Sequence, residues 1–189
     1  MKVIAITTLA CALTLPAASL ADEVTDAVDE AISAYKDGQL TEAVSQLDYA
    51  AGLIRQQKAE GILAVFPDPL SGWSAEDAES QSAGGMMMGG GITANRTYNK
   101  GNMNISIELV TDSPLLQSMM GMFNNPSLIT MNGGKLIKVQ GHKAIYNGQQ
   151  NDPEILLIVN GNAMFTLRTN GASGEDLKAY GEALNLDAL

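Results

Sequence analysis

Between residues 22 and 66 the apolar positions recur with the period of a helix. They are spaced every three or four residues from Val24 to Tyr35, and again from Leu40 to Ile54. Gly38 separates the two runs, because glycine takes the left-handed backbone conformation at a helix C-terminus without a Cβ clash. Pro67 ends the second run. A turn this short predicts two antiparallel helices that form a hairpin over residues 22–66.

After residue 91 the period changes to two, which is typical of strands with one buried face. Residues 92–98 and 103–109 alternate on either side of a turn and predict a β-hairpin. Residues 155–159 and 163–169 flank Asn160-Gly161, a pair that suits a type I′ turn because both positions need positive φ. Further strands are expected at residues 128–131, 135–139 and 143–147.

Two helices interrupt or close this strand region. One is predicted near 114–123, where Pro114 takes the first helical position. The other is predicted near 174–185, where Ser173 and Asp176 suit a capping box. The chain is therefore expected to be α+β: an N-terminal helical hairpin, then an antiparallel sheet of about six or seven strands with helices packed on one face. Residues 67–91, rich in glycine and methionine, are expected to be a linker or loop before a sheet domain over 92–189.

The first 21 residues have the three parts of a secretory signal peptide. Lys2 is the positive start, an apolar run follows to Leu15, and Ser19 and Ala21 are the small residues before the cleavage site. We expect cleavage after Ala21 and a periplasmic protein. The apolar run is shorter than the roughly 20 residues of a membrane-spanning helix, and no later run reaches that length. Cys11 lies inside the run, which disfavours a lipoprotein signal and leaves the mature chain without cysteine.

Composition narrows the classes of function. The formal charge of −10 would repel a polyanion, so nucleic acid is not an expected partner. A hydrophobic content of 46% against 17% charged residues indicates a packed core rather than a disordered chain. A single cysteine excludes a disulfide scaffold and a zinc-cysteine site.

The helical hairpin resembles part of a known repeat. The pattern Gly38-x-Leu40-x-x-Ala43-x-x-x-Leu47-x-x-Ala50 is similar to the second half of a tetratricopeptide repeat, and the resemblance spans about residues 24–64. Proteins of that family mostly bind other proteins, so the resemblance implies an interaction role. No second copy follows, and a generic helical hairpin with small residues at its contact explains the same pattern.

The order of elements from Trp73 to Leu189 resembles a second family. A Gly-Trp lead-in, a hairpin, an inserted helix, more antiparallel strands and a closing helix are similar to the PsbP-like α+β domain of photosystem proteins. That resemblance covers about residues 73–189 and implies a binding or assembly module.

Few catalytic arrangements can be built from these residues. His142 is the only histidine and is expected in a solvated turn between two strands. No nucleophile elbow, phosphate loop or dinucleotide fingerprint is present. Carboxylates such as Glu108, Asp112 and Glu154 leave a carboxylate-based hydrolase as an alternative. We expect no enzyme activity and no cofactor.

Methionine is the unusual residue. Six methionines form two clusters whose soft thioethers would suit Cu(I), so a copper or small-ligand binder is a further alternative: Met86, Met87, Met88, Met119, Met120 and Met122. Flexible packing or an adaptable contact surface explains the same residues. The leading prediction is a non-catalytic module that contacts another envelope protein, with these candidate contact residues: Tyr49, Trp73, Met86, Met87 and Met88.

Overall fold

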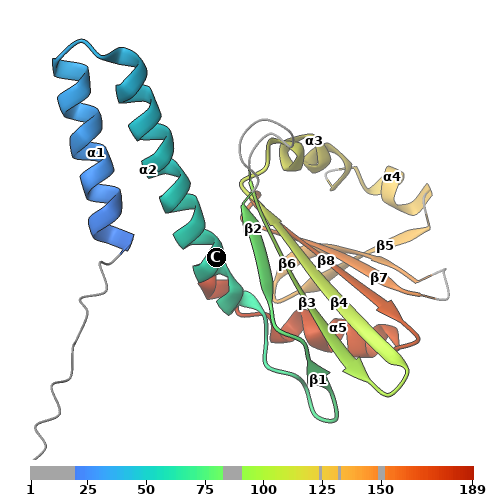
Figure 1. Ribbon diagram of the computed structural model, residues 1–189. Coiled ribbons are helices and arrows are strands. Elements are labelled where there is room, and N and C mark those ends of the chain that lie inside the picture. The colour runs from blue at the N-terminus through green and yellow to red at the C-terminus, as the bar shows by residue number, and fades with distance from the viewer. Residues whose placement is uncertain (1–19, 83–90, 124, 132, 149–151) are drawn as a thin grey trace, which may run out of the picture. The chain divides into compact units, whose positions relative to one another are not determined.

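The computed structural model describes residues 20–82, 91–123, 125–131, 133–148 and 152–189 (Figure 1). The chain divides into two compact units, one ending at Ala50 and the other spanning Ala51–Leu189. Residues 1–19 of the predicted signal peptide lie outside the described residues, as do residues 83–90 of the predicted linker.

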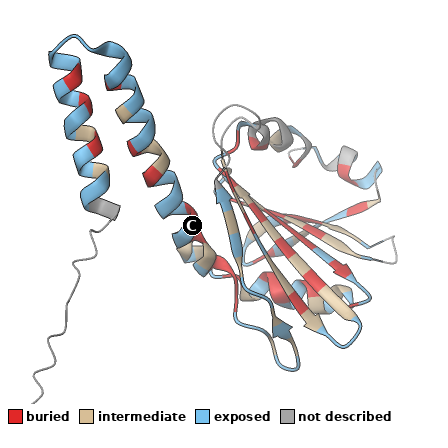
Figure 2. Ribbon diagram, viewed as in Figure 1, coloured by how far each residue is buried: buried red, intermediate tan, exposed pale blue. Residues whose placement is uncertain are grey.

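The predicted helical hairpin begins in the first unit and ends in the second. Helix α1 spans Leu20–Lys36, and helix α2 begins at Leu40 and ends at Gly61 in the second unit. Gly38 has a φ of 76°, and the amide of Gln39 donates a hydrogen bond of 2.8 Å to the carbonyl of Ala34. This bond closes the end of α1 as a glycine C-cap does. The buried positions of the first unit are alanines, which Figure 2 shows as short red bands on mostly pale blue helices: Ala27, Ala31, Ala34, Ala43 and Ala50.

The second unit is built on one antiparallel sheet, as predicted for the α+β class. Its strand order is β1-β3-β4-β8-β7-β6-β5, and β2 also pairs with the outer edge of β3. The strands are β1 Ser74–Ala75, β2 Glu79–Ser82, β3 Ile92–Lys100, β4 Met103–Thr111, β5 Gly134–Val139, β6 His142–Asn147, β7 Glu154–Val159 and β8 Ala163–Asn170. The helices are α3 Pro114–Phe123, α4 Pro126–Met131 and α5 Gly174–Ala183, with short 3-10 turns at Ile62–Val65 and Leu186–Ala188.

Both predicted β-hairpins are confirmed. Strands β3 and β4 pair from Ile92 opposite Thr111 to Lys100 opposite Met103. Strands β7 and β8 meet at Asn160-Gly161, whose φ angles of 52° and 74° are the positive values that a type I′ turn needs. The predicted helix near 174–185 is also confirmed, including the capping box of Ser173 and Asp176.

One face of the sheet carries the main core. Alternate residues of β4, β7 and β8 are fully buried there beneath Leu177 and Tyr180 of α5. They are Ile105, Ile107, Leu109, Ile155, Leu157, Phe165 and Leu167. Tyr98 of β3 packs against Tyr180 with ring centroids 4.3 Å apart. The apolar residues that alternate along the sequence of these strands are therefore the residues that are buried.

Helices α3 and α4 lie on the opposite face of the sheet, which differs from the expected packing of the helices on one face. Phe123 of α3 and Ile129 of α4 cluster with Ile145 of β6, and Leu156 and Ile158 of β7 pack beside them. Strand β7 is apolar at nearly every position, so it buries side chains on both faces. Helix α5 packs against one face of this strand, and α3 and α4 pack against the other.

The strand expected at residues 128–131 is wrong, because this segment is the helix α4. The side chain of Asn125 accepts a hydrogen bond of 3.2 Å from the amide of Ser127, and Pro126 takes the first helical position. These are helix-start features, and they override the strand preference of Ile129 and Thr130.

Candidate functional site: an apolar groove on the helical hairpin

Large apolar side chains are exposed along one side of the hairpin. Five of them, between 46% and 69% exposed, come from the two helices: Ile32, Tyr35, Leu40, Val44 and Leu47. Together with Ala31, Lys36 and Ala43 they line a groove of about 530 Å³. Scattered apolar residues are normal on a protein surface, but a contiguous apolar groove is typical of a binding site.

Helical spacing positions these side chains. Ile32 and Tyr35 are three residues apart on α1, and Leu40, Val44 and Leu47 follow at intervals of four and three on α2. Such spacings place side chains on one face of a helix. The tight turn at Gly38 then sets the two helices antiparallel, which joins the two stripes.

The sequence pattern suited a hairpin with small residues at its contact, and the burial of the helices agrees with it. In the structure the alanines form this contact, and Val44 and Leu47 remain more than half exposed. A pair of helices buries only a narrow stripe on each partner, and the small alanine side chains occupy that stripe. The wider apolar stripe is left on the surface, a result that the period alone did not reveal.

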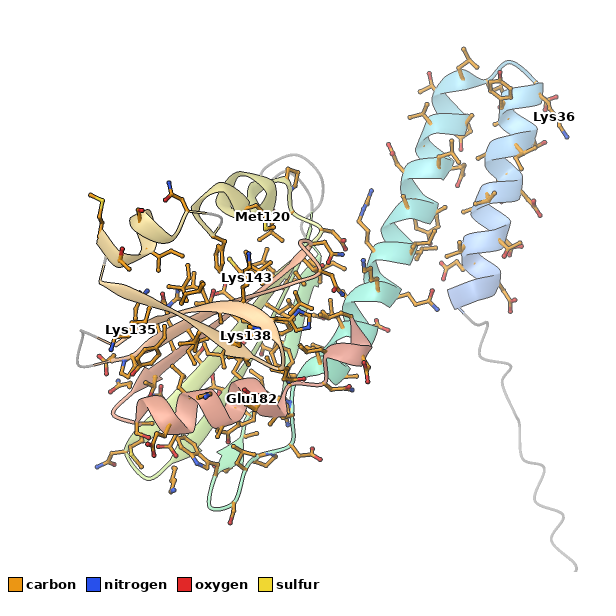
Figure 3. The ribbon with its side chains drawn as sticks, turned by 180° about the vertical axis from the view of Figure 1, so that it is seen from behind. Lys36, Met120, Lys135, Lys138, Lys143 and Glu182 are labelled. Atoms are coloured by element: carbon orange, nitrogen blue, oxygen red, sulfur yellow. The ribbon has the colours of Figure 1, made fainter. Side chains whose placement is uncertain are left out.

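The hairpin carries strong negative charge around this groove. Residues 22–50 contain eight acidic residues and one basic residue, Lys36, which Figure 3 labels at the turn end of α1. Asp29 precedes Ile32 by three residues and Asp48 follows Val44 by four, so both lie beside the groove on their helices. The groove is lined by apolar side chains and Lys36, on a hairpin whose other charged residues between 22 and 50 are acidic.

Tyr49 lies outside the groove lining. It is exposed, and its hydroxyl donates a hydrogen bond of 2.5 Å to the carboxylate of Glu23. This bond to Glu23 raises the pKa of Tyr49, because it stabilises the protonated phenol. The contact ties α2 to the start of α1.

Trp73 belongs to the second unit and is half-buried. Its ring meets the ring of Tyr180 edge to face at 5.5 Å, and the amino group of Lys100 lies 5.6 Å from the centre of the indole. Burial raises the pKa of Tyr180, whose hydroxyl accepts a hydrogen bond from the amide of Leu70. Trp73 therefore has a packing role within the unit, and its role in partner binding stays a prediction.

The methionine clusters are not brought together by any described contact. Met86, Met87 and Met88 lie outside the described residues, as do the side chains of Met119 and Met122. Met120 on α3 is half-buried. Within the described ranges no group of three or more histidine, cysteine, aspartate or glutamate residues is arranged to hold a metal ion.

Two of the three named carboxylates lie on one face of the sheet. The guanidinium of Arg168 on β8 donates to Glu154 of β7 at 2.7 Å and to Glu108 of β4 at 3.4 Å. Asp112 instead pairs with Lys58. Glu108 and Glu154 are thus engaged by one arginine on an accessible surface, whereas acid catalysis needs a free acid in a secluded site. The sequence contained no signal for the contact of Arg168 with both glutamates, because that contact depends on the order of the strands in the sheet.

His142 is half-buried at the first position of β6, opposite Val139. In the part of the chain that the structure describes, no helix is long and apolar enough to cross a bilayer.

Comparison with known proteins identifies no family. No protein-family model matches the chain, and no curated protein matches it. Among solved structures, a GTP-binding regulator from Thermotoga maritima is similar over 67% of this chain and 83% of its own, with 6% identity and a TM-score of 0.37. A likeness of this size carries no functional conclusion.

Proposed function

We propose that this chain is an exported, non-catalytic binding module that contacts another protein of the cell envelope through the groove of its helical hairpin. The observation that carries the proposal is the apolar groove itself. Five large side chains stay at least 46% exposed in a hairpin whose own contact consists of alanines. Covering such side chains stabilises a complex by roughly 25 cal/mol per Å² of apolar area.

The negative charge of the hairpin favours a partner with complementary charge. With eight acidic residues against one lysine in residues 22–50, a second copy of the hairpin would bring like charges together. A partner segment with an apolar stripe and flanking lysines or arginines meets both features of the groove. We therefore expect an amphipathic, basic segment of the partner to occupy it.

Site-specific photo-crosslinking in the native host tests this proposal. A photoreactive amino acid at Tyr35 or Leu47 is expected to give one discrete crosslinked species, whereas the same amino acid at Glu175 on α5 serves as the control. The substitution Val44→Glu should abolish the crosslink, and Val44→Ile should retain it. Equal crosslinking at Tyr35 and Glu175, or a crosslink unaffected by Val44→Glu, would contradict the proposal.

Native mass spectrometry of the full-length gene product, purified from a periplasmic extract, tests export separately. The expected mass is that of residues 22–189 with no addition. An unprocessed or lipid-modified mass would refute cleavage after Ala21. Bound copper or an organic ligand would instead favour the binder alternative.

A further inference from the structure

The charges of this chain are segregated along the sequence. The 39 residues from Ser113 to Asn151 contain no aspartate or glutamate, although the chain has 21 acidic residues in all. This segment forms α3, α4, β5 and β6, and its charged residues are Lys135, Lys138 and Lys143. It is a positively charged region of an acidic protein.

The three lysines belong to the hairpin of β5 and β6, where Figure 3 labels them. Lys138 and Lys143 are directly opposite each other on one face of the sheet, whereas Lys135, three residues from Lys138, is on the other face of the same edge strand. The side chains of all three are exposed, and no hydrogen bond or ion pair joins these side chains to a described residue. Glu182 of α5 approaches this hairpin, but its carboxylate accepts a hydrogen bond from the amide of Gln140.

Two lysines directly opposite each other destabilise a sheet by repulsion. Lysines on an edge strand discourage pairing with other sheets, which explains those on β5. Protection of a sheet edge does not explain Lys143, because β6 is paired on both sides, with β5 and with β7. An external anion would relieve the repulsion between Lys138 and Lys143.

Exposed apolar side chains accompany the lysines. Met131, at the end of α4, is 81% exposed and precedes β5 by three residues. Leu136 is 48% exposed and is two residues from Lys138, so both side chains are on the same face of β5. Apolar side chains flanked by lysines are typical of surfaces that rest on anionic lipid, with the lysine stems extending to the headgroups.

We propose that the corner formed by Met131, Lys135, Leu136, Lys138 and Lys143 is a docking surface for an anionic phospholipid bilayer. The lysines contact the phosphate headgroups, and Met131 and Leu136 enter the boundary between headgroups and acyl chains. The acidic remainder of the chain is repelled by the same bilayer, which orients the protein with this corner toward it. The surface belongs to the sheet unit and is independent of the hairpin groove.

Vesicle flotation with the mature protein tests this surface. The protein is expected to float with vesicles of phosphatidylcholine and phosphatidylglycerol, to stay behind with phosphatidylcholine alone, and to be released at high salt. The variant K135Q/K138Q/K143Q should bind at least tenfold more weakly, since each lysine near an anionic surface contributes about fivefold. The charge-matched control R55Q/K58Q/K178Q should bind as the wild type does, and Met131→Ser should weaken binding without changing its salt dependence.

Three results would overturn the proposal. They are no flotation with the anionic vesicles, equal loss in K135Q/K138Q/K143Q and in the control variant, and capture of poly-glutamate in place of vesicles, which would assign the corner to an acidic protein partner. Unchanged Trp73 fluorescence in each variant shows that the sheet unit is folded, so a loss of binding is not a loss of structure.

Discussion

Replacing Tyr98 by phenylalanine removes a single hydroxyl from the core of the sheet unit. The side chain is fully buried, and its hydroxyl donates a hydrogen bond of 2.8 Å to the carbonyl of Pro67. Arg96 donates to the same carbonyl at 3.1 Å, so this oxygen keeps a partner in the variant. The expected cost at neutral pH is therefore about 1 kcal/mol, the net value of one hydrogen bond without an orphaned acceptor.

At alkaline pH the order of stability should reverse. Burial raises the pKa of Tyr98 from 10.0 to about 12. The folded state therefore holds the phenol proton more tightly than the unfolded state does, and this stabilisation is complete below pH 10 and lost as the pH rises through about 12. Each pKa unit corresponds to about 1.4 kcal/mol, so the wild type loses about 1.4 kcal/mol by pH 11. The variant has no such loss, and the two stability curves should cross near pH 11.

Denaturant unfolding followed by fluorescence measures both effects. Trp73 is the only tryptophan, and its contact with Tyr180 makes it a probe of the sheet unit. Tyr35→Phe is the control, because Tyr35 is 69% exposed and the loss of its hydroxyl should leave the free energy of unfolding unchanged. If the stability difference between Tyr98→Phe and the wild type stays constant up to about pH 11, the assigned burial of the phenol is wrong.

Four other substitutions test separate parts of the structure. Val44→Glu in the groove should change the free energy of unfolding by less than about 0.5 kcal/mol, since the side chain is already exposed, and a larger change in thermal melting would mean that Val44 supports the fold. Ser173→Ala removes the cap of α5 and should cost about 1 kcal/mol at neutral pH. The hydrogen bond from the Ser173 hydroxyl lowers the pKa of Asp176 in the folded state. The stability that this bond provides is therefore present above the ordinary aspartate pKa and lost as the pH falls through the lowered pKa of the folded state. Urea unfolding in which Ser173→Ala costs as much stability in acid as at neutral pH would contradict the cap. Gly161→Ala places a side chain at a φ of 74° and should destabilise the protein by about 1 to 2 kcal/mol. Gly52→Ala lies within α2, where the added methyl group meets no atom within 4 Å, and should stabilise the protein by up to about 1 kcal/mol. Denaturant titration of both variants distinguishes turn strain from a general effect of the added methyl group.

Local chemistry explains which elements were predicted correctly. The hairpin at Asn160-Gly161, the capping box at Ser173 and the glycine end of α1 each depend on residues a few positions apart. Backbone conformations of this kind follow from Cβ sterics and short-range hydrogen bonds, which the sequence states directly. The error at residues 128–131 arose where two local signals conflicted, and the helix-start residues Asn125 and Pro126 prevailed over β-branched neighbours.

The candidate surfaces depended on contacts between distant residues. The sequence by itself determined the α+β class, the segregation of charge and the apolar period of the hairpin. It did not determine which apolar residues would be buried, because burial depends on what packs against each face: alanines sufficed between α1 and α2, and Val44 and Leu47 were left exposed. Likewise only the antiparallel register placed Lys138 opposite Lys143 and Arg168 between two glutamates. Periodicity assigns a residue to a face, and tertiary packing alone decides whether that face is covered.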